Sequence, residues 1–412
     1  MSTRFKLASR PLAIAGLALC VLLQACDNKG DANPASTAMA ADAPVLSVPL
    51  QRNQGWLVEA QSADNKPHRV LLDTGATTNI MDSEGPLAAA PITPQAEAGF
   101  LRQGTLNVPS TDGAITADTA SDPVQIKLGL GPALRIQGWA IPAGTLTMRS
   151  DLARLSAVTD TPFEAIIGNE NMRQLTWRAD YVTGRLTAWA NKAPAHDWQQ
   201  CTFMTLNTNA RTPNIELKLG NESNFFMVDT GDNGDISLPQ PLFDSLADAK
   251  VFERITTSFT YDVSDRFLPS QTGLLAGLSI GQKALPKLRV SGGSATLRLG
   301  MGLLEKMDRF EIDLRNYRFC FDLPSVPRDS TLSTMGAALH RSGERYEVAA
   351  LAPHGRLDAS GIKIGDQIAT VDQTSVATLK LSRLIELLGA ATTTQVTVQR
   401  GGRTLVIKLK PA

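Results

Sequence analysis

The stretch HRVLLDTGATTNIM (His68–Met81) has the same layout as NFFMVDTGDNGDISL (Asn224–Leu238). In each stretch a run of apolar residues leads directly into Asp-Thr-Gly, which begins at Asp73 in the first and at Asp229 in the second. Short apolar runs bounded by turn residues are typical of buried strands. The sequence therefore predicts two buried strands, each of which delivers an aspartate to a tight loop.

The two stretches belong to a longer internal repeat. AIIGNENMRQLTWRADYVTGRLTAW (Ala165–Trp189) parallels LRLGMGLLEKMDRFEIDLRNYRFCF (Leu297–Phe321). Each has apolar residues followed by a glycine, a short helix-like turn, a strand ending near an aspartate, a tight turn and a final strand. Self-similarity of this kind indicates one structural unit used twice. We therefore predict two related β-rich lobes, a first repeat over residues 45–192 and a second repeat over residues 200–323.

Two aspartates at matching positions suit a pair of carboxyl groups that share a proton. Carboxyl groups about 3 Å apart cannot both ionise cheaply, so one of them keeps a proton. The ionised member can take a proton from water while the protonated member donates to a peptide carbonyl. Glycine after each threonine permits a tight loop that brings backbone N–H groups close to the carboxylates. This chemistry needs no nucleophilic serine or cysteine and no metal.

VLLDTGATT with AIIGNEN, and FMVDTGDNG with LRLGMGLL, resemble the retropepsin-like family of aspartic proteases. The resemblance covers roughly residues 45–323 and implies a mainly β, bilobal pepsin-like acid protease fold in which one chain supplies both lobes. It implies that Asp73 and Asp229 are the catalytic pair. It also implies that the neighbouring threonines and glycines support the loops, namely Thr74, Gly75, Thr230 and Gly231.

Three further residues are candidates for the substrate cleft. Ala76 follows the first Asp-Thr-Gly, and Asp232 stands at the matching place in the second repeat, where the family usually has a small residue. A third carboxylate there would alter the protonation of the pair or shape a subsite. Tyr261 lies in a candidate flap, ITTSFTYDVSDRFL (Ile255–Leu268), and FLRQGTLNVPSTDGAIT (Phe100–Thr116) is the candidate flap of the first repeat. An ordinary hairpin residue is the alternative for Tyr261.

The acidic loop after Asp229 does not fit a calcium site. An EF-hand-type loop needs oxygen ligands at its first, third and fifth positions and a glutamate at its twelfth. Here the third residue is Gly231 and the twelfth is Gln240. The four histidines are scattered singly along the sequence and do not cluster with Cys201 or Cys320. We therefore predict no metal and no cofactor, and Asp235 receives no role.

A different kind of sequence follows the second repeat. PSVPRDSTLS is a proline- and serine-rich linker over residues 324–333. RYEVAALAPHGRLDASGIKIGDQIATVDQTSV, with Gln373 in place of the usual glycine, resembles a PDZ domain, which we place over residues 334–412. The resemblance implies binding of a peptide C-terminus or a partner protein; a purely structural PDZ domain is the alternative. Its peptide groove is predicted at Met335, Gly336, Ala337, Ala338 and Leu339.

The N-terminus has the pattern of a targeting signal. Three basic residues precede a short apolar run, Pro11–Leu23, which falls short of the roughly 20 apolar residues of a membrane span. The run ends at LQAC, which resembles the lipobox of bacterial lipoproteins. The resemblance implies a signal peptide over residues 1–25, lipidation of Cys26 and a flexible tether over residues 26–44. A plain secretory signal is the alternative.

Further residues bear on the compartment. Asp27, directly after Cys26, resembles the signal that retains lipoproteins in the inner membrane of Gram-negative bacteria. Cys201 and Cys320 remain as an even pair in an oxidising compartment. The first and last strands of a retropepsin-type lobe often lie near each other, and these cysteines sit on those strands. We therefore predict a disulfide between Cys201 and Cys320.

Together these features predict a periplasmic, lipid-anchored aspartic endopeptidase. It would hydrolyse polypeptides through a water between Asp73 and Asp229, and its PDZ domain would select or regulate substrates. The alternative is a catalytically inactive lipoprotein that uses the same cleft and the PDZ groove as a peptide-binding scaffold. Forty basic residues balance forty acidic ones, so no nucleic-acid partner is indicated.

Overall fold

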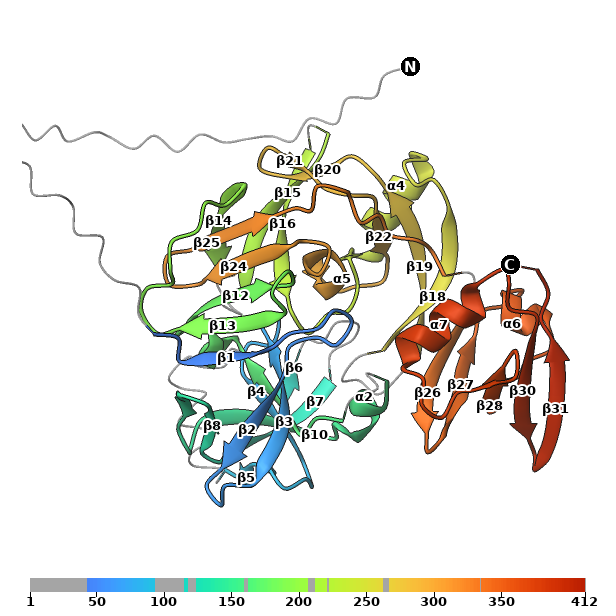
Figure 1. Ribbon diagram of the computed structural model, residues 1–412, viewed down its shortest axis with the longest axis horizontal. Coiled ribbons are helices and arrows are strands. Elements are labelled where there is room, and N and C mark those ends of the chain that lie inside the picture. The colour runs from blue at the N-terminus through green and yellow to red at the C-terminus, as the bar shows by residue number, and fades with distance from the viewer. Residues whose placement is uncertain are drawn as a thin grey trace, which may run out of the picture. The chain divides into compact units, whose positions relative to one another are not determined.

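The chain is mainly β-structure (Figure 1). The computed structural model describes residues 43–92, 115–117, 124–158, 162–206, 212–220, 222–261, 267–333 and 335–411. The predicted signal peptide, Cys26, Asp27 and nearly all of the tether lie outside the described residues, as does most of the first candidate flap. No helix in the described ranges is both long and apolar enough to span a membrane.

Most of the first repeat folds into a sheet of ten strands, counted over the described residues (Figure 1). In several of its strands buried side chains alternate with more exposed ones, because successive residues of a strand point to opposite faces. Two short helices accompany it, α2 (Ala153–Val158) and α3 (Asn169–Met172). The strands, in spatial order, are β5 (Ala90–Pro91), β7 (Val124–Leu130), β10 (Leu146–Ser150), β4 (Asn79–Asp82), β11 (Ala165–Gly168), β3 (Pro67–Asp73), β2 (Leu57–Ser62), β8 (Leu134–Ile136) and β9 (Trp139–Ile141), with β6 (Ile115–Ala117) paired to β7.

A second sheet, of fifteen described strands, contains the second repeat and three strands of the first. Helices α4 (Gln240–Asp248) and α5 (Met301–Leu304) belong to this repeat. In spatial order the strands are β1 (Leu46–Pro49), β13 (Arg185–Trp189), β12 (Thr176–Asp180), β24 (Arg309–Asp313), β25 (Arg318–Asp322), β14 (Gln200–Leu206), β15 (Pro213–Leu219), β16 (Glu222–Asp229), β23 (Arg298–Gly300), β17 (Ile236–Ser237), β22 (Leu288–Ser291), β19 (Phe267–Leu275) and β18 (Ile255–Tyr261), with β20 (Leu278–Ile280) and β21 (Lys283–Ala284) paired beside β15. The repeats are joined where β12 pairs with β24, near the centre of Figure 1.

Both repeats build the same strand arrangement around their aspartate. In the first, β11 runs parallel to β3, and Gly168 lies opposite Asp73. In the second, β23 runs parallel to β16, and Gly300 lies opposite Asp229. An antiparallel strand flanks each pair, β4 in the first repeat and β17 in the second. The downstream apolar-glycine motif of each repeat is therefore placed directly beside its Asp-Thr-Gly.

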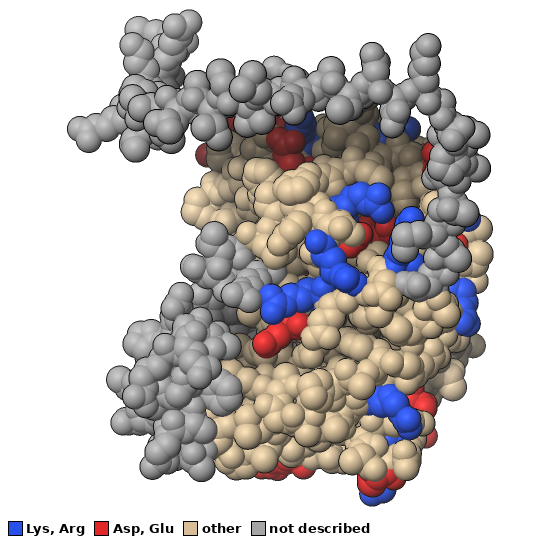
Figure 2. Space-filling model, turned by 90° about the vertical axis from the view of Figure 1, so that its left-hand side faces the viewer, with Lys and Arg blue, Asp and Glu red and all other residues tan. Residues whose placement is uncertain are grey.

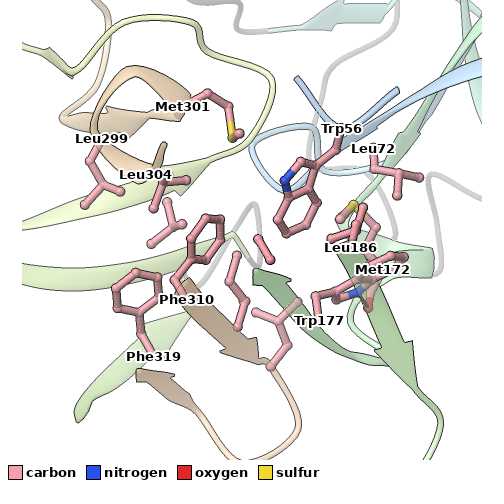
Figure 3. Close-up of a cluster of buried hydrophobic side chains, with 14 of the residues drawn as sticks. Trp56, Leu72, Met172, Trp177, Leu186, Leu299, Met301, Leu304, Phe310 and Phe319 are labelled. Atoms are coloured by element: carbon pink, nitrogen blue, oxygen red, sulfur yellow. Dashed lines mark hydrogen bonds between the residues drawn. The ribbon is translucent and has the colours of Figure 1, made fainter. Parts of the chain in front are cut away.

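One hydrophobic core extends across both repeats. Trp56 of the first repeat stacks on Phe310 of the second, with 5.7 Å between ring centroids, and lies 5.9 Å from Trp177. Figure 3 shows these rings among methionine and leucine side chains from both repeats. Large buried aromatic side chains contribute much of the burial energy of a core. The two aspartate-bearing strands are thus held on a shared apolar base.

Cys201 and Cys320 form a disulfide, the pair that the sequence predicts. Cys201 lies on β14 and Cys320 on β25, and the two residues are register partners of these adjacent antiparallel strands. The bond links residues 119 positions apart. It therefore closes the second repeat by joining its first strand to its last.

The C-terminal residues form a separate six-stranded sheet, coloured orange to red in Figure 1. Helix α7 (Leu381–Gly389) buries leucines at helical spacing against this sheet, and α6 (Arg356–Ala359) is a single turn. Gly401 and Gly402 have φ of +54° and +77°, which a two-residue hairpin turn requires. The strands are β26 (Ala337–Ser342), β27 (Arg345–Leu351), β28 (Gln367–Val371), β30 (Gln395–Arg400) and β31 (Arg403–Lys408), with β29 (Thr374–Ser375) paired to β28.

Charged side chains of both signs lie on the surface. Figure 2 shows one face on which Lys and Arg side chains gather near the centre, with a few Asp and Glu side chains beside them.

A cavity of about 430 Å³ has Arg178, Arg318 and Glu311 in its wall. Both arginines pair with Glu311, at 2.6 and 3.1 Å. Glu311 therefore compensates part of the positive charge of this cavity within the fold.

Candidate active site

The two Asp-Thr-Gly loops hold their aspartates with matching backbone hydrogen bonds. In the first loop, Asp73 Oδ1 accepts from the N–H of Gly75 at 2.7 Å and of Ala76 at 3.1 Å. In the second, Asp229 Oδ1 accepts from the N–H of Gly231 at 3.0 Å and of Asp232 at 3.1 Å. Bonds from N–H groups favour the charged carboxylate and fix its orientation.

The threonines of the loops bind across the junction between the repeats. Thr74 N–H donates to Thr230 Oγ1 at 3.0 Å, and Thr230 N–H donates to Thr74 Oγ1 at 3.2 Å. Each hydroxyl donates in turn to a backbone carbonyl of the opposite strand: Thr74 to Val228 at 2.6 Å, and Thr230 to Leu72 at 2.9 Å. Both threonines are buried. These four bonds lock the two loops in register.

The carboxyl groups of Asp73 and Asp229 meet at this junction as hydrogen-bond partners. A methyl group added at Gly75 would overlap the carboxyl of Asp229, and one added at Gly231 would overlap that of Asp73. Each glycine is therefore required so that the aspartate of the opposite repeat can approach. Asp229 is 5% exposed and Asp73 is half-buried.

Burial raises the pKa of both Asp73 and Asp229 above the ordinary value for aspartate. The charge of Asp73 raises the pKa of Asp229 further, because two adjacent carboxylates repel. The arrangement is that of a carboxyl pair that keeps one proton and titrates as a unit. It can present one hydrogen-bond donor and one proton acceptor to the same bound water.

Arg298 is a neighbour of the pair that the sequence analysis does not identify. Its Nη1 lies 3.4 Å from Asp229 Oδ2 and 3.8 Å from Asp232 Oδ2. Asp232 also accepts from Gly234 N–H at 2.7 Å and from Ser237 Oγ at 3.0 Å. The predicted third carboxylate is thus present beside the pair and is compensated by an arginine. A basic residue within an otherwise apolar strand, LRLG, is the signal that could have indicated it.

Asp235, which has no predicted role, anchors the chain that follows the second repeat. Its carboxylate accepts from the backbone N–H and the guanidinium of Arg289, at 2.8 and 2.9 Å, and from the hydroxyl of Ser330. Burial raises the pKa of Asp235, but the charge and hydrogen bonds of Arg289 outweigh it and leave the pKa below its usual value. The predicted linker is therefore fastened to the second Asp-Thr-Gly loop.

No group of three or more metal-ligating side chains occurs among the residues that the structure describes.

A cavity of about 490 Å³ adjoins the second loop. Thr230 and Gly231 form part of its wall, together with apolar side chains of the first repeat, Leu57, Leu71 and Phe163. Glu305 also lines it, and burial raises the pKa of this side chain to about 7. A concave, partly apolar wall beside reactive groups is the usual form of a ligand site.

The other predicted site residues lie on β18 and in the C-terminal residues. Tyr261 ends β18, and its ring packs 4.7 Å from that of Phe267 across the hairpin with β19. Met335 is buried in the core of the C-terminal sheet, and Gly336 has a φ of +65°. Ala337, Ala338 and Leu339 lie on β26, which is the edge strand of that sheet.

Comparison with protein-family models and with curated proteins found no match to the sequence. The geometry of the two loops is therefore the basis for an assignment of function.

Proposed function

We propose that the protein is an aspartic endopeptidase whose fold consists of two retropepsin-like lobes. The observation that carries the proposal is the meeting of Asp73 and Asp229, held by equivalent hydrogen bonds from two copies of one loop. Proximity of two carboxyls, burial and a shared proton are the requirements of this chemistry.

The reaction would use a water held between the two carboxyl groups. The ionised carboxylate removes a proton from the water as its oxygen attacks the peptide carbonyl carbon, while the protonated carboxyl donates to the carbonyl oxygen. Collapse of the tetrahedral intermediate transfers a proton to the leaving nitrogen and breaks the C–N bond. The loop N–H groups and the threonine bonds hold both carboxyls in place, so that little reorganisation is needed.

The test of this proposal is cleavage by the purified chain of denatured casein and of a peptide library over a range of pH. Asp73→Asn and Asp229→Asn should each lower the rate at least about a hundredfold, because each removes one member of the acid–base pair. Asp64→Asn is the matched control, since Asp64 is an exposed aspartate of the first repeat. Full activity in either pair variant would contradict the assignment, and no cleavage by the wild type at any pH would favour a peptide-binding scaffold.

We further propose that residues 334–412 form a PDZ domain that binds an extended peptide end along β26. An edge strand can accept a peptide as an additional strand through backbone hydrogen bonds. Within the stretch that resembles a PDZ domain, the buried carboxylate of Asp366 binds Arg400 through two contacts of 2.6 Å. Binding of peptides with a free C-terminus, and its loss for amidated peptides, would test this.

The proposed location is the periplasm, with a lipid at Cys26 as the anchor. Labelling of cells with a radioactive fatty acid should mark the wild-type chain and not Cys26→Ser. Equal labelling of both would overturn the anchor.

A further inference from the structure

Arg298 occupies a position that is apolar in the first repeat. It lies on β23 two residues before Gly300, and the equivalent residue on β11 is Ile166, two residues before Gly168. Ile166 is buried in an apolar cluster with Leu152 and Phe163. Arg298 is also buried, with 8% of its surface exposed. A buried guanidinium is costly unless it is paired and hydrogen-bonded.

The surroundings of Arg298 satisfy it from two sides. Ser294 Oγ accepts from Nε at 3.2 Å and from Nη2 at 3.0 Å, which fixes the plane of the guanidinium. Nη1 faces the carboxylates of Asp229 and Asp232, at 3.4 and 3.8 Å. The second repeat therefore departs from the first at two positions that contact each other, Arg298 in place of Ile166 and Asp232 in place of Ala76.

These two departures compensate each other electrostatically. Asp232 alone would bring a further carboxylate to the Asp73–Asp229 pair, and Arg298 alone would leave its positive charge beside the pair without a second acidic partner. A further charged group near this cluster is Arg289, which is bound to Asp235 and interacts with Asp232 at longer range. Arg298 lowers the pKa of both Asp73 and Asp229 against the effect of burial, whereas Asp232 raises that of Asp229.

We propose that Arg298 and Asp232 form a positioning ion pair that keeps one negative charge on the Asp73–Asp229 pair as the pH falls, and so sets the acid limit of peptide hydrolysis. The proposal rests on the proposed function, because the acid limit belongs to the same carboxyl pair. Arg298 orients Asp229 and stabilises its charge, and Asp232 holds the guanidinium and moderates its effect.

The test is the pH dependence of kcat/KM with a peptide that has no titratable side chain. Arg298→Gln should move the acid limb to higher pH by about 1–3 units, because an opposite charge in contact shifts a carboxyl by that amount. Asp232→Asn should move it in the opposite direction, to lower pH, by roughly 0.5 unit, since Asp232 acts on the pair at longer range. Arg298→Lys keeps the charge and should move the acid limb less than Arg298→Gln.

Arg318→Gln is the control, because it removes a cation of the second repeat that pairs with Glu311 and not with the Asp73–Asp229 pair. It should leave the acid limb in place. Opposite shifts for Arg298→Gln and Asp232→Asn would support the proposal, since a purely structural role lowers the rate equally at every pH. Unchanged acid limbs, or equal losses at every pH that Arg298→Lys does not restore, would overturn it. If Arg298→Gln fails to fold, the shift of Asp232→Asn alone decides.

A measurement without substrate separates this proposal from the proposed function. The pH dependence of the thermal unfolding midpoint, taken relative to Asp73→Asn in the same background, reports the titration of the carboxyl pair. Its inflection should lie at higher pH in Arg298→Gln and at lower pH in Asp232→Asn than in the wild type. If the wild type cleaves nothing but the two variants show these shifts, the enzyme assignment alone is contradicted. If the inflections of all three proteins are identical, the ion pair alone is contradicted.

Discussion

The two Asp-Thr-Gly loops are alike in their backbones and unlike in the side chains behind them. Both aspartates accept two N–H bonds, and both threonines bind the opposite strand. Three residues after the aspartate, the first repeat has Ala76 and the second has Asp232; six residues after it, they have Asn79 and Asp235. The first loop is thus supported by neutral groups and the second by charged groups.

This difference shows which features two copies of a loop must share and which they need not. The backbone bonds bring the carboxyls together, and any change in them would separate the pair. The supporting side chains need not bind the same groups. Asn79 accepts from Gly168 N–H at 3.0 Å and from Asn171 Nδ2 at 3.0 Å, whereas the Asp235 side chain binds Arg289 and Ser330. In the second repeat the N–H of Gly300 donates to the backbone carbonyl of Asp235.

The largest expected effect tests the shared part of the comparison. Gly75→Ala places a methyl group where the carboxyl of Asp229 lies, and Gly231→Ala places one where the carboxyl of Asp73 lies. In each variant the carboxyl that meets the methyl group must move. A displacement of about 1 Å at a reacting group can cost a hundredfold in rate, and we expect at least that loss in kcat/KM for each variant. Gly85→Ala is the control, because Gly85 has an ordinary φ and an added methyl group there meets only the side chain of Asp82, at 3.0 Å or more. A mild effect in only one loop would show that the loops are not equivalent.

A smaller effect tests the charged support of the second loop. Asp235→Asn removes a buried charge that binds Arg289 and Ser330 and should destabilise the chain by about 3 kcal/mol at neutral pH. The pKa of Asp235 is depressed in the folded state, so its stabilisation is present above the unfolded value of 3.8 and is lost as the pH falls through the folded pKa. The difference from wild type in urea midpoint should therefore shrink below about pH 4.

The converse variant in the first repeat sharpens this prediction. Asn79→Asp would bury a carboxylate beside Gly168 and Asn171 without an arginine, because the first repeat has no counterpart of Arg289 in contact with Asn79 among the described residues. It should destabilise the chain most above the pKa of the new carboxyl. Equal behaviour of Asn79→Asp and wild type at neutral pH would show that the charge of the supporting residue is unimportant.

The smallest effect concerns the residue five positions after the downstream glycine, Glu305 in the second repeat and Arg173 in the first. Burial raises the folded pKa of Glu305 to about 7 from an ordinary 4.5, so the stability linked to its proton is present below 4.5 and is lost as the pH rises through 7. Glu305→Gln should therefore be more stable than wild type at pH 8, by roughly 2–3 kcal/mol, and similar at pH 4. Arg173→Gln is the matched control and should show no such pH dependence in its thermal midpoint.

The mainly β class and the internal repeat could be predicted from the sequence alone. These follow from local patterns: apolar runs that end in Asp-Thr-Gly predict β3 and β16, and the downstream apolar-glycine motifs predict β11 and β23. The helix of the C-terminal sheet was also predictable, since its leucines recur at helical spacing over Leu381–Gly389.

The side chains that meet at the carboxyl pair could not be predicted from the sequence and became known only from the fold. Arg298 is 69 residues from Asp229, and Ser330 is 95 residues from Asp235, so no local pattern connects them. Their contacts arise because β23 lies parallel to β16 and because the chain after the second repeat returns to the loop. The electrostatic character of the site depends on these distances, whereas the strand pattern depends on residue type and spacing alone.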